Sequence, residues 1–408
     1  MREVGQRRRD TKAQRAAWAA TLSGLCASLV GIGLARFAYT PLLPAIVGAH
    51  WFDATQAAYI GAANLAGYLA GALLGRPLAY RLSEAVTLRG MMLLATLAFF
   101  ACAHPTEFVW FSAWRFVSGV AGGSLMVLAA PAALRCVPPT RQGMASGVIF
   151  MGVGAGVVAS GTLVPLLLRH GLQVTWDGLG AISTLLSAFA WAGWSSAYAA
   201  APLPHAPEGA IEPSPFALRA LFAQYALSAV GLVPHMVFLV AFVARGLGRG
   251  FQAGAEYWVL FGLGAMIGPL LAGALGDRIG FARTLRMAWV LEAAAVALPV
   301  LDPSLLGMIV SSIVVGCFVT GVVSLALGRI HELLLHHPSR QGAAWRSATV
   351  AFALAQAVAA YGYSYLFSLS AHAYGPLFLL GAAALAIALL IDLAVGNSES
   401  RARFGVNG

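Results

Sequence analysis

The sequence predicts an all-α polytopic membrane protein with twelve transmembrane helices, arranged as two parallel six-helix repeats. Of its 408 residues, 60% are hydrophobic and only 10% are charged, whereas soluble domains carry roughly 25% charged residues. The apolar residues divide into twelve runs long enough to cross a hydrocarbon layer of ~30 Å. Four stretches of the first half recur in the second, which indicates one six-helix unit present twice.

The twelve predicted helices follow from these apolar runs. The first run is too long for the core of a signal peptide and lacks a cleavage pattern, so we expect it to remain as helix 1. Asp53 and Gln56 have the spacing of a capping box at the start of helix 2. The predicted helices cover residues 18–46, 54–79, 87–104, 108–133, 143–168, 178–200, 217–244, 253–275, 284–300, 304–328, 343–370 and 375–396.

Four collinear matches relate the two halves at spacings of 197 to 202 residues. In the third match, Arg115 is aligned with Cys317, so the positive charge belongs to one half only. Two of the matches contain polar loop residues, which chance similarity among apolar helices does not explain. The matched pairs are 69–76 with 271–278, 87–89 with 284–286, 115–120 with 317–322, and 139–143 with 338–342.

The distribution of positive charge predicts the topology. With the N-terminus in the cytoplasm, 20 of the 25 Lys and Arg residues are cytoplasmic, Arg169, Arg245 and Arg249 lie outside, and Arg36 and Arg115 lie within helices. The positive-inside rule therefore places both termini in the cytoplasm. The net charge of +10 falls in short loops, so no nucleic-acid partner is predicted. Contact of the basic N-terminus with anionic lipid is an alternative use of its charge.

A polar segment rich in proline, at 200–215, divides the chain. Since six helices precede it, both halves enter the membrane from the same side, and the repeat axis runs along the membrane normal. The predicted parts are a basic cytoplasmic N-terminus (1–17), an N-terminal six-helix bundle (18–200), a cytoplasmic linker (201–216), a C-terminal six-helix bundle (217–396) and a cytoplasmic tail (397–408).

A Gly-x-x-x-Asp-Arg-x-Gly loop between the second and third helices of the second half, formed by Gly273, Asp277, Arg278 and Gly280, resembles the signature of the major facilitator superfamily of secondary transporters. Residues 31–44 are similar to the helix 1 signature of the bacterial YbfB-like branch of that superfamily. The resemblance implies the major facilitator fold, a bacterial inner membrane and cytoplasmic gating loops. The first half has Gly75 where the acid is expected, so a gating acid is missing there. The gating residues implied are Gly71, Arg76, Gly273, Asp277, Arg278 and Gly280.

Two arginines within helices are the leading candidates for substrate binding. A guanidinium inside an apolar helix costs from ~3 to more than ~10 kcal/mol, so Arg36 should face protein or water. Arg115 lies at a similar depth, and the resemblance places helices 1 and 4 on a central cavity. Two forked donors there suit a carboxylate or a phosphate. The alternative is that each arginine is tied to backbone carbonyls opened by Pro41 and Pro44, or to a neighbouring helix.

Other polar side chains are candidates for contacts with a solute. Tyr39 and Thr40 follow Arg36 by three and four residues, on nearly the same helix face. Thr40 alternatively caps a carbonyl freed by the prolines. Gln356 and Tyr361, on helix 11, either flank an organic solute or belong to interhelical packing.

Two titratable groups are candidates for proton coupling. His235, in helix 7, is a proton carrier or substrate donor, or else a neutral histidine satisfied by a neighbouring helix. Glu292 lies midway along helix 9, which the resemblance places outside the central cavity. A protonated or internally paired role is therefore favoured for Glu292 over proton coupling.

No signature of catalysis, cofactor binding or metal binding is found. The sequence has no Walker loop, Rossmann fingerprint or nucleophile elbow, and its four cysteines are scattered singly. It is therefore predicted not to be an enzyme and to need no cofactor or metal. Gly152, Gly154 and Gly156 loosely resemble an antiporter signature, but small residues at helix contacts explain them.

The predicted function is secondary active transport of a small organic solute, preferably an anion, by alternating access between the two bundles. Arg36 would anchor the anion and Arg115 would assist, while Tyr39 and His235 shape the opposite contacts. The transporter is expected to be a monomer, with a proton as candidate coupling ion. The alternatives are an exporter of neutral or cationic drugs or metabolites, and a transport-inactive membrane sensor or scaffold.

Overall fold

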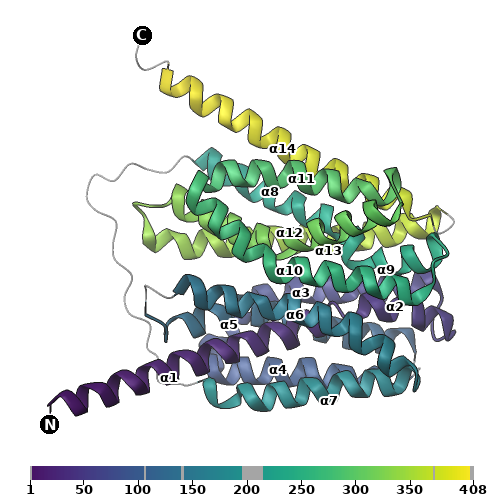
Figure 1. Ribbon diagram of the computed structural model, residues 1–408, viewed down its shortest axis with the longest axis horizontal. Helices are drawn as coiled ribbons and strands as arrows, with labels where there is room; N and C mark the ends of the chain where they lie inside the picture. Colours follow the sequence, from purple (N-terminus) through teal and green to yellow (C-terminus); the bar gives the residue numbers. More distant parts are fainter. Residues whose placement is uncertain (1, 105–106, 139–141, 195–214, 371–372, 405–408) are drawn as a thin grey trace.

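Two helical bundles are stacked on each other in the computed structural model, as Figure 1 shows. The structure describes residues 2–104, 107–138, 142–194, 215–370 and 373–404, and all regular elements within them are helical. α1 begins and α14 ends on the same side of the molecule, which we call the terminal side; the other is the opposite side. The predicted fold class is confirmed.

The N-terminal bundle holds six crossings, the first of which is interrupted. A π-helix, η1, separates α1 from α2, and a short 3-10 turn, η3, ends the bundle. The elements are α1 (Arg2–Ser28), η1 (Leu29–Leu34), α2 (Tyr39–Gly48), α3 (Ala54–Leu82), α4 (Glu84–Ala101), α5 (Phe108–Leu134), α6 (Gln142–Leu168), α7 (Leu172–Ala190) and η3 (Trp191–Gly193).

The C-terminal bundle repeats this plan, and its first crossing is also interrupted. Two π-helical segments, η4 and η5, flank the short α9. The elements are α8 (Pro215–Val233), η4 (Pro234–Phe238), α9 (Leu239–Ala241), η5 (Phe242–Gly246), α10 (Gly250–Ile279), α11 (Phe281–Leu301), α12 (Leu305–Leu333), α13 (Pro338–Leu369) and α14 (Gly375–Phe404).

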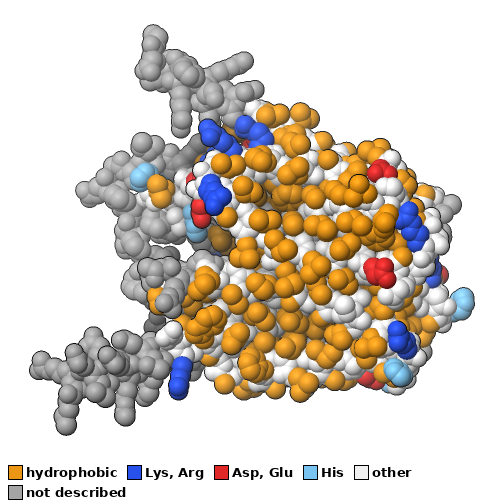
Figure 2. Space-filling view, viewed as in Figure 1, with side chains coloured by type: hydrophobic (Ala, Val, Ile, Leu, Met, Phe, Trp, Pro, Cys, Tyr) orange, Lys and Arg blue, Asp and Glu red, His pale blue; other side chains and the backbone are white. Residues whose placement is uncertain are grey.

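Eleven helical segments among the described residues are long and apolar enough to span a bilayer. α7, with 19 residues, packs against α4 and α1 and completes the first half. Figure 2 shows hydrophobic side chains across the broad middle of one face, with charged side chains toward the two ends. This surface is what a lipid environment requires, because apolar side chains there face hydrocarbon instead of water.

Several predicted boundaries are corrected. α1 begins at Arg2 instead of residue 18, and α14 continues to Phe404, because Arg, Lys, Ala and Glu sustain a helix beyond the membrane. The sixth helix was expected at 178–200 but spans Leu172–Ala190; Gln173 and Asp177 interrupt its apolar run and hid its start. Most of the predicted linker at 201–216, and residues 139–141 of the fourth match, lie outside the described residues.

The motif residues expected in gating loops lie mostly on helices. Gly71 and Arg76 belong to α3, while Gly273, Asp277 and Arg278 belong to α10. Only Gly280, with φ +88°, makes the turn between α10 and α11. Asp277 and Arg278 lie on a helix because α10 extends past its predicted end at residue 275, whereas Gly71, Arg76 and Gly273 already fall within the helices predicted at 54–79 and 253–275.

Glycines bring neighbouring helices into backbone contact at equivalent places in the two halves. A Cβ on Gly67 would lie 2.0 Å from the carbonyl oxygen of Phe116, and a Cβ on Gly268 would lie 2.0 Å from that of Cys317. The two glycines are 201 residues apart in the chain, and so are the two residues whose carbonyls they contact. The helix contacts therefore repeat at 201 residues, although the sequence matches in this region repeat at 202.

This spacing corrects the counterpart of Arg115. At a spacing of 201 residues, the counterpart of Arg115 is Gly316. Cys317 is instead the counterpart of Phe116, although the sequence match aligned it with Arg115. A Cβ on Gly316 would lie 2.0 Å from the carbonyl oxygen of Phe261, so no side chain fits there. A shift of one residue rotates a helix by ~100°, which sequence similarity between two apolar helices does not resolve.

Two local expectations are confirmed. Asp53 accepts a hydrogen bond from the Gln56 backbone at 2.7 Å, and the Gln56 side chain accepts one from Asp53 N at 3.2 Å, which completes a capping box. The glycines of α6 serve helix packing, since a Cβ on Gly156 would lie 2.4 Å from the Cα of Gly33.

Candidate functional site

The first crossing is not α-helical between residues 29 and 38, a stretch that contains Arg36. The π-helix η1 leads into turns at 35–38, and regular helix resumes at Tyr39. Pro41 has no N–H, so the carbonyl of Phe37 accepts from Thr40 N at 3.2 Å instead. The π-helix η4 interrupts the corresponding crossing of the C-terminal half. Such breaks within a membrane expose backbone carbonyls that side chains must satisfy.

The Arg36 guanidinium has no acidic partner among the described residues. Its Nη2 lies 3.7 Å from Sδ of Met236, and its buried Nε has no hydrogen-bond partner. Its Cζ lies 5.2 Å and 4.9 Å from the ring centroids of Phe37 and Tyr68. Sulfur is a weak acceptor, and each aromatic face contributes about 1 to 2 kcal/mol. Most of the donor capacity of Arg36 is therefore unused.

Arg36 lies between two small cavities. One has a volume of about 40 Å³ and extends toward the terminal side; the other has about 20 Å³ and reaches Tyr39, Thr40 and Arg115. No acidic residue lines either cavity. Since a water molecule needs roughly 10 to 15 Å³, the larger one has room for about three waters. Arg36 is half-buried between these two cavities. The larger cavity's polar lining consists of Arg36, Tyr68, Tyr225, Thr320, Thr349 and Gln356.

Arg115, from α5, is tied to the backbone beside Arg36. Its Nη1 donates to the carbonyl of Ala35 at 2.6 Å, and Ser118 Oγ donates to the same carbonyl at 3.2 Å. Asn64 donates from Nδ2 to the carbonyl of Arg115 at 3.0 Å. The Arg115 Cζ lies 4.8 Å from the Tyr39 ring centroid. Arg115 thus holds the interrupted segment in place through a backbone carbonyl, although the carbonyl of Ala35 is not one that Pro41 or Pro44 opens.

We expect Arg115→Gln to lower the stability of the protein, because the Ala35 carbonyl loses its charged donor. A loss of about 1 to 2 kcal/mol is expected from one such interhelical bond. Thermal unfolding of the purified protein in detergent measures it, with Arg219→Gln, an exposed arginine of α8, as control. An unchanged melting temperature for Arg115→Gln would contradict this role.

The structure gives Tyr39 and Thr40 internal partners. The Tyr39 hydroxyl donates to the carbonyl of Ala57 at 2.7 Å, and the Thr40 hydroxyl donates to the carbonyl of Met236 in the other half. Thr40 therefore caps a carbonyl of η4 and none of its own helix. Both side chains still line the smaller cavity.

Gln356 lies beside Arg36, whereas Tyr361 does not. Gln356 is fully buried, its Nε2 lies 3.6 Å from Sδ of Met236, and its Oε1 has no partner. Tyr361 is 41% exposed and packs against Tyr59, with the ring centroids 6.2 Å apart. Tyr361 lines neither cavity, so its packing alternative fits its surroundings better.

His235 and Glu292 lie inside the C-terminal half and line neither cavity. Ser311 donates to the carbonyl of Ala295 at 2.7 Å, so its oxygen must accept from His235 Nε2, 2.8 Å away. His235 is thereby satisfied by a neighbouring helix, although its Nδ1 has no partner. Glu292 is fully buried on α11 and neither carboxylate oxygen has a hydrogen-bond partner among the described residues. The expected internal pairing of Glu292 is not found there.

Several hydrogen bonds between the two halves lie at the level of Arg36 or nearer the opposite side. Arg36 precedes the end of the first span, Gly48, by about 18 Å of helix. Besides the Arg36 and Thr40 contacts with Met236, Arg245 Nη2 donates to the carbonyl of Pro44 at 2.8 Å. Trp258 Nε1 donates to Ser160 Oγ at 3.0 Å. These contacts close the opposite side.

Three residues that surround Arg36 were not predicted from the sequence. Tyr68 and Tyr225 are buried and line the larger cavity, and Met236 contacts both Arg36 and Gln356. A tyrosine within an apolar helix is a usable signal, since its hydroxyl needs a polar partner. Met236 gives no such signal, because a methionine in an apolar helix is ordinary.

Comparison with known proteins identifies the fold and the family. Residues 28–393 match the family described as uncharacterised MFS-type transporter YbfB. The chain belongs to this family. No curated protein matches the transporter by sequence. Its fold is similar to that of the xylose transporter XylE from E. coli in a partially occluded inward open conformation, with a TM-score of 0.69 and 13% identity over 92% of this chain and 97% of that chain.

Membership of the family establishes the general activity. The transporter is a multi-pass membrane protein of the major facilitator superfamily and not an enzyme. It moves a small-molecule solute by secondary transport, with alternating access between its two halves. The expectations on family, fold and class of activity are confirmed.

Proposed function

We propose that the transporter carries a small organic anion and that Arg36 is its anchor. The supporting observation is that two embedded arginines, and no acid, line the two cavities at the interface of the bundles. Arg115 already binds a backbone carbonyl, whereas Arg36 contacts only sulfur and aromatic faces. A carboxylate accepting both arms of the Arg36 fork would supply the missing counter-charge.

The anion would take the place that the sulfur of Met236 now occupies beside Arg36 and Gln356. This sulfur accepts from Arg36 Nη2 and from Gln356 Nε2, two donors of different halves. A methionine side chain is flexible, so its displacement costs little. A carboxylate in place of the sulfur would receive stronger hydrogen bonds from the same donors and would join the two halves through the solute. The proposed site also includes Tyr39, Thr40 and Arg115. It does not include Tyr361.

The proposed cycle uses the two bundles, 18–200 and 217–396, as the moving bodies of a monomer. By the positive-inside rule, the terminal side is cytoplasmic, in a bacterial inner membrane. The contacts on the opposite side then form the outer gate. Arg76, Asp277 and Arg278, exposed near the terminal-side ends of α3 and α10, are proposed as inner-gate residues. A coupling proton would bind at His235 or Glu292, away from the solute.

Arg245→Ala should favour opening of the outer gate, because the hydrogen bond to Pro44 is lost. A contribution of about 1 kcal/mol shifts the ratio of the two states about five-fold. Spin labels at the exposed positions 107 and 252, near the starts of α5 and α10, report the distance between the halves on this side. Arg249→Ala is the matched control, since Arg249 donates to Tyr257 and to the Pro303 carbonyl within its own half. Equal distance distributions for both variants would argue against the gate.

A thermal-shift screen tests the class of solute. Purified transporter is heated with mono- and dicarboxylates, phosphorylated compounds, neutral sugars and organic cations. Binding of a ligand at 100 times its dissociation constant stabilises the folded state by about 2.7 kcal/mol. We expect only anions to raise the melting temperature. Stabilisation by neutral or cationic compounds alone would overturn the proposal.

A further inference from the structure

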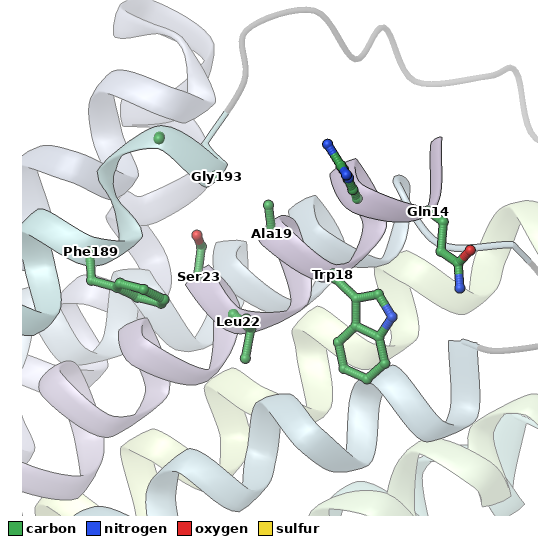
Figure 3. A pocket seen from close by; sticks show the side chains of 9 residues that line it. Gln14, Trp18, Ala19, Leu22, Ser23, Phe189 and Gly193 are labelled. Carbon is green, nitrogen blue, oxygen red and sulfur yellow. The ribbon is translucent and has the colours of Figure 1, made fainter. Parts of the chain in front are cut away.

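A groove on the terminal side lies between α1 and the end of α7, as Figure 3 shows. Its volume is about 450 Å³, more than ten times that of the cavity at Arg36. Trp18, Leu22 and Phe189 form apolar walls and are 47%, 36% and 65% exposed. The Phe189 ring points toward α1 beside Leu22 and Ser23. An apolar groove of this size is open to one acyl chain.

The floor of the groove is rigid. Ser23 Oγ donates to the carbonyl of Ala190 at 3.0 Å and ties α1 to α7. A Cβ on Gly193 would lie 1.9 Å from Ser23 Oγ, so the helices meet there without space. Arg89 holds the end of α7 through hydrogen bonds of 2.9 to 3.1 Å to the carbonyls of Trp191 and Trp194. The groove is therefore built into the fold.

The mouth of the groove is basic. Gln14 and the exposed Arg15 line the groove just before Trp18, where the sequence predicts the first membrane helix to begin. No acidic residue is among its nine lining residues. The sequence before Arg15 adds five more basic residues between positions 2 and 12 against two acids. Tryptophan and arginine together are typical of the region of lipid headgroups.

We propose that this groove binds an anionic phospholipid of the leaflet on the terminal side. The phosphate would lie at Arg15, and one acyl chain would pack along Trp18, Leu22 and Phe189. Charge complementarity selects an anionic headgroup, and the exposed apolar walls select a lipid tail. The site is separate from the Arg36 cavities and does not depend on the class of solute.

Native mass spectrometry of the delipidated full-length transporter tests this site. The protein is reloaded with phosphatidylglycerol or with phosphatidylcholine. We expect preferential retention of phosphatidylglycerol and about five-fold weaker retention by Arg15→Gln, the effect of one basic residue at a membrane surface. Arg219→Gln, at the terminal-side start of α8, is the matched control and should bind as wild type does.

Variants that fill the groove distinguish lipid binding at a defined site from general electrostatic attraction of anionic lipid to the basic terminal side. Ala192→Trp and Leu22→Trp fill it from opposite walls, and both should lose retained phosphatidylglycerol while a size-exclusion profile confirms folding. Equal retention of both lipids by the wild type would overturn the proposal. So would equal losses in Arg15→Gln and Arg219→Gln, or full retention by the folded groove-filling variants.

Discussion

Replacing Arg36 with methionine should abolish binding of the anion without loss of stability. Truncating one partner of a buried charge pair costs about 2 to 5 kcal/mol, which weakens binding at least about 30-fold. The free protein, in contrast, is relieved of a cation with no acidic partner, whose insertion costs from ~3 kcal/mol upward. We therefore expect an equal or higher melting temperature. Thermal unfolding with and without the best anion measures both effects.

Two further variants separate charge from shape at this position. Arg36→Lys keeps the charge but loses the planar fork, so we expect intermediate binding. Arg115→Gln should lose stability, since Arg115 has a carbonyl partner. Anion binding that persists in Arg36→Met would show that the anchor lies elsewhere. A fall in its melting temperature as large as that of Arg115→Gln would show that Arg36 is structural.

Gly71→Ala should strongly destabilise the transporter. A Cβ at this position would lie 2.1 Å from the carbonyl oxygen of Val120, closer than any real contact, so α3 and α5 must separate. Overpacking of this kind costs about 1 to 3 kcal/mol and sometimes more, and we expect the upper end because the obstacle is backbone. The yield of monodisperse protein and its thermal unfolding provide the measurement.

Gly273→Ala is the control, because Gly273 lies on α10, next to Ala272, the counterpart of Gly71 at a spacing of 201 residues. A Cβ on Gly273 meets nothing within 4 Å. Alanine there should even stabilise α10, by up to about 1 kcal/mol, since glycine is a poor helix former. If both variants lose stability alike, the two glycines share a role that their packing does not reveal.

The sequence allowed the fold to be predicted because a bilayer leaves few choices. Length, apolar content and the internal repeat define twelve crossings in two halves. Helix ends were less predictable, as α1 and α14 show, because good helix formers extend a helix into water. The residue-by-residue alignment of the two halves could not be predicted either, since the contacts of Gly67 and Gly268 depend on three-dimensional packing.

The site was predictable in part. An arginine within an apolar helix stands out, and both arginines line a cavity between the halves. Which of them has spare donors depends on the Ala35 carbonyl, exposed by a helix break that no residue pattern specifies. The partner of His235 could not be predicted from the sequence either, since Ser311 is 76 positions away in the chain.

The unpaired Arg36 guanidinium has a kinetic consequence for the proposed anion cycle. An empty carrier that closes would withdraw this cation from water with no acidic partner among the described residues, whereas a loaded carrier would withdraw a partly neutralised pair of charges. The return of the empty carrier is then the slow step of the proposed transport cycle. A carrier with this imbalance turns over faster when it returns with a second anion than when it returns empty, so the charge arrangement favours exchange over net flux.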